Sequence, residues 1–134
     1  MINGRCECGE VRFEVRGEIL DFSHCHCSIC RRLHGAAYAS FAGVERSAFR
    51  FIAGETSITT YPSSARNDRV FCSKCGSAVL CDPKTEPGRL YLSMSAIEGN
   101  PPLPEAYHQY AASRAPWHDI DDELKRYDAA VPPG

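Results

Sequence analysis

The sequence contains little that would direct it to a membrane or to nucleic acid. Its apolar stretches fall well short of the ~20 residues of a membrane-spanning helix, and the opening MINGRCECGE has no apolar run typical of a signal peptide. Lys and Arg total 15 against 17 Asp and Glu, a formal net charge of -2, so no positive field attracts phosphate backbones or anionic lipid. We therefore expect a cytoplasmic protein that contacts neither membrane nor nucleic acid.

Internal repeats, low-complexity segments and linkers are also missing. A chain of 134 residues is long enough to bury one core and short for two ordinary domains. Its hydrophobic content of 43% and charged content of 24% are those of a globular chain. We expect residues 1–134 to form a single domain.

Short segments with the period of a β-strand make up most of the chain. Val11, Phe13 and Val15 alternate with charged residues, and Gly17 ends the run. Comparable segments, separated by turn residues, predict further strands at 36–44, 49–52, 58–61, 70–72, 78–82 and 90–94. The pattern predicts a mainly β fold.

One or two short helices are expected beside these strands. Ser28 can cap a helical turn that Gly35 can stop. A second short helix is predicted over 119–127, near the end of the chain.

Cysteine is what the sequence has in abundance, with eight residues. In a reducing compartment, such a number indicates metal binding more than disulfides. Cys6 and Cys8 form a CxC pair, and Cys72 and Cys75 form a CxxC pair followed by glycine. Together they offer the four thiolates of a structural zinc site, whose metal would supply on the order of 10 kcal/mol of folding free energy. The alternative is a set of buried thiols or a disulfide.

A second cluster places Cys25, Cys27 and Cys30 within six residues. Three thiolates leave a zinc ion one open position, as in catalytic zinc sites. A soft, thiolate-bound ion favours a further thiol, which would be deprotonated there and could attack an electrophilic carbon such as an aldehyde.

Neighbouring residues leave alternatives open for this second cluster. His24, His26 or His34 could supply a fourth ligand and make the site structural, or the thiols could carry no metal. Arg31 and Arg32, just after the cluster, could bind substrate carboxylates.

The segments GRCECGEVRFEV, CHCSICRRLHGAAYASF and FCSKCGSAV, followed by a late histidine, APW and IDDEL, resemble the glutathione-dependent formaldehyde-activating enzyme family, which includes centromere protein V. The resemblance runs from Gly4 to about Tyr127. It implies a zinc-containing β-tent built of small antiparallel sheets. It also implies two zinc ions per chain, with structural ligands Cys6, Cys8, Cys72 and Cys75 and second-site ligands Cys25, Cys27 and Cys30.

The same resemblance implies a carbon-sulfur lyase that joins formaldehyde to the thiol of glutathione, giving S-hydroxymethylglutathione. Its partners would be a glutathione-like thiol and a small aldehyde. His26, His34 and His108 are the candidates for a general acid or base. Trp117 is expected to pack in the core, as is the lone Cys81. The competing hypothesis is a non-catalytic zinc-binding module for a protein partner.

Overall fold

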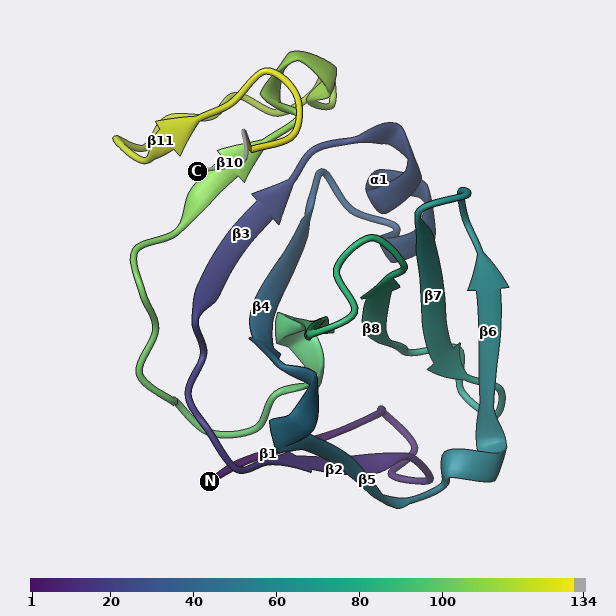
Figure 1. Cartoon of the computed structure of the whole chain (residues 1–134). Coiled ribbons are helices and arrows are strands. Elements are labelled where there is room, and N and C mark those ends of the chain that lie inside the picture. Colours follow the sequence, from purple (N-terminus) through teal and green to yellow (C-terminus); the bar gives the residue numbers. More distant parts are fainter. Residues whose placement is uncertain (132–134) are drawn as a thin grey trace.

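The strands gather into two sheets (Figure 1). The structure is a computed structural model and describes residues 1–131. The smaller sheet is antiparallel and has the order β1-β2-β5, with β1 at Ile2–Arg5, β2 at Arg12–Val15 and β5 at Phe49–Ala53.

The larger sheet has eight strands in the order β11-β10-β3-β4-β9-β8-β7-β6. They are β3 (Asp21–Cys25), β4 (Ala39–Glu45), β6 (Ile58–Pro62), β7 (Asn67–Cys72), β8 (Ala78–Pro83), β9 (Arg89–Ser93), β10 (Tyr107–Gln109) and β11 (Lys125–Arg126). Within the sheet, all neighbours in the run β3-β4-β9-β8-β7-β6 pair antiparallel. Strand β10, in contrast, pairs in parallel with both β3 and β11. The mainly β prediction is confirmed, with two sheets and this parallel edge.

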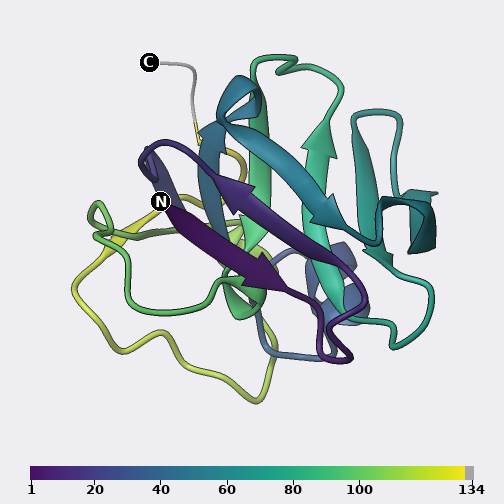
Figure 2. The same ribbon diagram turned by 90° about the horizontal axis from the view of Figure 1, so that it is seen from below.

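The hydrophobic core lies between the two sheets. Phe13 of β2 is fully buried, and its ring lies over Gly4 of β1, where a side chain would collide with it. From the larger sheet, Val44, Val79 and Leu92 meet this face. Figure 2 shows the smaller sheet crossing the longer strands, and its β1–β2 turn lies beside the β7–β8 turn.

One α-helix is present among residues 1–131, α1 at Ser28–His34, and it confirms the first predicted helix. Its N-cap is Cys27, one residue before the predicted cap, and the Cys27 side chain accepts a hydrogen bond from the Cys30 N–H. Gly35 ends the helix in the left-handed conformation, as expected. Residues 1–131 also contain four short 3-10 helices: η1 (Arg46–Ala48), η2 (Glu55–Ser57), η3 (Met94–Ala96) and η4 (Ala111–Ser113).

The helix predicted over 119–127 is wrong. The segment forms bends and then β11, whose Lys125 pairs with Tyr107 of β10. The Asp122 carboxylate accepts a hydrogen bond from the Leu124 N–H, and Arg126 donates to the Ile120 carbonyl. These local bonds compete with a helical turn, because short acidic side chains satisfy nearby backbone groups in bent conformations.

None of the helices within residues 1–131 is both long and apolar enough to cross a bilayer.

Candidate metal centres

The first cysteine cluster is built from two similar turns, one from each sheet. Cys6 and Cys8 lie in the β1–β2 turn, and Cys72 and Cys75 lie at the start of the β7–β8 turn. In both turns a glycine N–H closes back on the first cysteine's carbonyl, at 3.1 Å in the β1–β2 turn and 2.8 Å in the β7–β8 turn. Those glycines have φ of 79° and 80°, a conformation that favours glycine, which explains the glycine after each pair.

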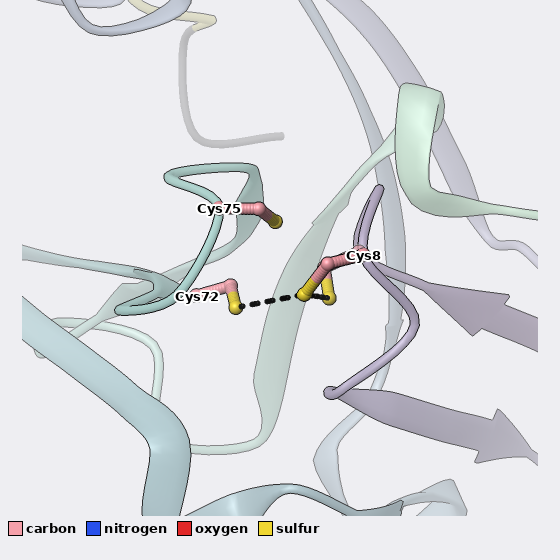
Figure 3. A group of neighbouring side chains, drawn as sticks. Cys8, Cys72 and Cys75 are labelled. Atoms are coloured by element: carbon pink, nitrogen blue, oxygen red, sulfur yellow. Dashed lines mark hydrogen bonds between the residues drawn. The ribbon is translucent and has the colours of Figure 1, made fainter.

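The four sulfurs converge on one point. All of them lie within 4.8 Å of one another, with Cys6 Sγ and Cys8 Sγ 3.6 Å apart and Cys8 Sγ and Cys72 Sγ 3.9 Å apart (Figure 3). A tetrahedral zinc with bonds of ~2.3 Å would separate its sulfurs by about 3.8 Å. A disulfide needs about 2.05 Å. The geometry therefore fits a metal centre, and these cysteines are not disulfide-bonded.

Three of these sulfurs, those of Cys6, Cys72 and Cys75, form hydrogen bonds that suit a thiolate. The N–H of Val11 donates to Cys6 Sγ at 3.3 Å, and that of Lys74 donates to Cys72 Sγ at 3.4 Å. The hydroxyl of Ser77, 3.2 Å from Cys75 Sγ, is the main cause that lowers the pKa of Cys75 to about 5. Groups that stabilise a thiolate also suit it for a metal ion.

The second cluster arises where β3 meets α1. Cys25 is the last residue of β3, Cys27 caps the helix, and Cys30 lies in its first turn. Their three sulfurs lie within 4.8 Å of one another. Cys25 and Cys30 are buried and Cys27 is half-buried. No histidine nitrogen or carboxylate oxygen of the described residues joins this group, so it offers three protein ligands.

Hydrogen bonds among the three thiols shift their pKa values in different directions. Hydrogen bonds with the Cys25 and Cys30 side chains lower the pKa of Cys27 to about 2, whereas hydrogen bonds with Cys27 and Cys30 raise the pKa of Cys25. Arg69 Nη1 donates to Cys30 Sγ at 3.5 Å. A negative charge is thus stabilised at this cluster, which is the chemistry of a thiolate metal site.

A cavity of about 330 Å³ lies against the second cluster. Its wall combines the three thiols with cationic and aromatic side chains of β4, β7, β9 and β10 and with Glu86 of the β8–β9 loop. The lining residues include Arg66, Arg69, Cys81, Tyr91, Tyr107 and Tyr110. Cys81 is buried as predicted, and burial raises its pKa to about 11. It lies outside the three-sulfur group.

Arg31 and Arg32 do not line this cavity. Arg31 Nε donates to the His26 carbonyl at 3.4 Å, and both arginines border a separate hollow with Trp117. Trp117 is 71% exposed, so its predicted place in the core is wrong. Its segment, 114–124, lies mostly on the surface, with Ala115 as its one buried residue.

None of the candidate histidines His26, His34 and His108 lines this cavity. His26 is fully buried, and its Nε2 shares a hydrogen bond of 2.8 Å with Nδ1 of His108, which donates from Nε2 to the Asp122 carboxylate at 2.9 Å. Since His108 Nε2 is the donor to Asp122, its Nδ1 accepts from His26 in the neutral pair. Burial and the neighbouring His108 lower the pKa of His26 to about 4. His34 lies at the end of α1, edge-on to Phe41.

Sequence reasoning missed the cationic and aromatic part of the cavity wall. Arg69 lies opposite Cys81 in the β7–β8 pairing, and Tyr107 lies opposite Ser23 in the parallel β3–β10 pairing. Both positions follow from strand register, which no local motif encodes. The cavity wall also contains Tyr110, which is the one residue other than glycine with positive φ, 55°, among residues 1–131. Such strained residues cluster at functional sites.

Two sheets joined by a four-thiol centre, with a three-thiol centre beside a cavity, define a small β protein with two candidate metal sites. The chain belongs to the glutathione-dependent formaldehyde-activating enzyme family, whose model matches residues 1–113. It is 33% identical to a protein of Halomonas elongata that bears that enzyme's name provisionally, over 98% of this chain and 89% of the relative.

Two further likenesses agree with this assignment. An uncharacterized lyase of Schizosaccharomyces pombe is 25% identical over 57% of this chain and 53% of its own length. A crystal structure of a Rhodobacter sphaeroides protein superposes with a TM-score of 0.63 at 30% identity, covering 75% of this chain and 91% of that one.

Proposed function

We propose that this protein is a zinc-dependent carbon-sulfur lyase-type enzyme that joins a small aldehyde to a thiol such as glutathione. Residues 1–134 would act as one zinc-binding domain in the cytoplasm. The observation that carries the proposal is the second cluster: three sulfurs that line a cavity and that no fourth ligand from residues 1–131 joins. Family membership supports the proposed reaction class.

The donor sets fit zinc at both clusters. Cys6, Cys8, Cys72 and Cys75 would hold a structural ion, and Cys25, Cys27 and Cys30 would hold the second. When bound at the second cluster, zinc supplies a Lewis acid that lowers the pKa of a thiol at its open position.

The proposed reaction needs no oxidant or reductant. The S–H bond of the incoming thiol breaks, its sulfur forms a bond to the aldehyde carbon, and the carbonyl oxygen takes up a proton to become a hydroxyl. The chain's own residues supply the surroundings. A cavity of about 330 Å³ suits a small organic molecule, and its two arginines give the positive charge that a carboxylate-bearing thiol requires.

The test is adduct formation by the zinc-loaded protein. Glutathione and formaldehyde are mixed with the protein, and S-hydroxymethylglutathione is followed by NMR exchange measurements against the spontaneous rate. We expect a faster rate with protein, and a Cys27→Ser variant at the spontaneous rate with nearly unchanged thermal unfolding. Ser28→Ala, the next residue in α1, is the matched control and should remain active.

Two results would count against the proposal. A rate equal to the spontaneous one, with two zinc ions bound, would remove this activity. A Cys27→Ser variant that unfolds as readily as a variant of the first cluster would instead support the non-catalytic zinc module.

A further inference from the structure

We propose that Arg69 is a positioning residue of the three-cysteine site, where its guanidinium fixes the Cys30 sulfur and balances the negative charge of the ligated cluster. The inference deepens the proposed function and rests on its assignment of a metal to Cys25, Cys27 and Cys30.

The first support is geometric. Arg69 reaches the cluster from β7, a strand 39 residues further along the chain than Cys30, and its Nη1–H donates to Cys30 Sγ at 3.5 Å. Its Nε–H donates to Ser63 Oγ at 3.0 Å, and its Cζ lies 5.9 Å from the centre of the Phe41 ring. Three separate contacts therefore hold the guanidinium in one orientation, with one N–H aimed at a sulfur.

The second support is the absence of a carboxylate partner. Within residues 1–131, Arg69 forms no ion pair, although Arg46 pairs with Asp82 and Arg50 pairs with Glu14. The side chain of Arg69 is half-buried. A partly desolvated cation needs a negative partner, and the sulfurs supply one.

The contact with Arg69 would compensate the formal charge of the ligated cluster. Three thiolates contribute -3 and a divalent ion contributes +2, so the ligated cluster carries a formal charge of -1. The cluster is largely buried, with Cys25 4% and Cys30 2% exposed, and an uncompensated charge there is costly. Arg69 brings the sum to zero. Groups of this kind, which touch the ligands and not the metal, typically change metal affinity 10–100-fold.

Arg66 provides a matched comparison. It lines the same cavity and carries the same charge, yet it forms no hydrogen bond to a cysteine among the described residues. A general attraction of substrate to positive charge would involve both arginines. A role in holding the metal centre involves Arg69 alone.

The experiment measures metal affinity without any substrate. Zinc-loaded wild-type protein, Arg69→Gln, Arg69→Lys and Arg66→Gln are titrated with a colorimetric chelator, and the two ions are resolved by their release. We expect Arg69→Gln to weaken the more weakly bound, second ion by 10–100-fold while the first stays unchanged. Arg69→Lys should recover part of the loss, since it keeps the charge without the forked geometry. Arg66→Gln should match wild type.

Cobalt substitution gives a spectroscopic readout of the same site. The sulfur-to-cobalt charge-transfer band of the second ion should shift in Arg69→Gln and stay in place in Arg66→Gln. Retention of the first ion in every variant shows that the fold is intact.

The proposal is overturned if Arg69→Gln binds the second ion as tightly as wild type, or if Arg66→Gln weakens it equally. A variant with a lower melting temperature but wild-type affinity shows Arg69 to be merely structural, which also overturns it. The absence of a second ion in wild type removes both this inference and the proposed function. Failure of adduct formation with unchanged metal results removes only the proposed function.

Discussion

The two cysteine clusters differ in how far apart their ligands lie in the sequence. The first joins residues 64 positions apart, from turns of different sheets, whereas the second is drawn from six consecutive residues. An ion in the first would close a long loop and tie the small sheet to the large one, which stabilises the fold. An ion in the second would close almost no loop. On the proposed assignment, an ion in the first cluster would stabilise the fold, and an ion in the second would be available for chemistry.

The strongest test of this comparison is Cys72→Ser. Cys72 is fully buried in the first cluster, and structural zinc sites supply on the order of 10 kcal/mol, comparable to the entire ~5–15 kcal/mol stability of a domain. We expect the variant to be largely unfolded at 25 °C, as measured by near-ultraviolet circular dichroism and thermal scans. Cys81→Ser, a buried cysteine outside both clusters, is the control and should stay folded. Equal behaviour of the two variants would show that the first cluster does not hold the fold.

A smaller effect is expected from Gly76→Ala in the β7–β8 turn. Gly76 has φ of 80° and open space around its Cα, so an added Cβ costs only backbone strain, about 1–2 kcal/mol. Gly88→Ala is matched, because that glycine also faces open space but has no positive φ. Chemical denaturation of both should show a loss for Gly76→Ala alone. A loss of the same size in Gly88→Ala would mean that the turn conformation is not the cause.

The two cysteine clusters could be predicted from the sequence, but the residues of the cavity wall could not. Cysteine pairs followed by glycine carry their turn geometry locally, so their convergence could be predicted from spacing. The wall of the cavity depends on the β7–β8 register that sets Arg69 and on the parallel docking of β10 that sets Tyr107. Neither follows from a short segment. The mistaken helix over 119–127 also has a non-local cause beside its local hydrogen bonds, because the distant His108 donates to the Asp122 carboxylate.

The smallest expected effect concerns an ion pair between β2 and β5 of the small sheet. The Glu14 carboxylate on β2 accepts a hydrogen bond from Arg50 Nε on β5 at 2.5 Å and pairs with Arg16 at 3.3 Å. Arg50 first, and Arg16 with it, hold the pKa of Glu14 below its ordinary 4.5. A depressed pKa in the folded state means that the stabilisation is complete above pH 4.5 and is lost as pH falls through the lower, folded-state pKa.

Glu14→Gln should therefore lower the melting temperature at pH 7 by a few degrees at most, with the deficit shrinking at pH values below the ordinary glutamate pKa. Glu18→Gln, whose carboxylate forms no ion pair among residues 1–131, is the control. Thermal scans of both variants across this pH range, with zinc present throughout, separate the ion pair from the cluster. A deficit that stays constant with pH would mean that packing, and not the charge of Glu14, joins β2 to β5.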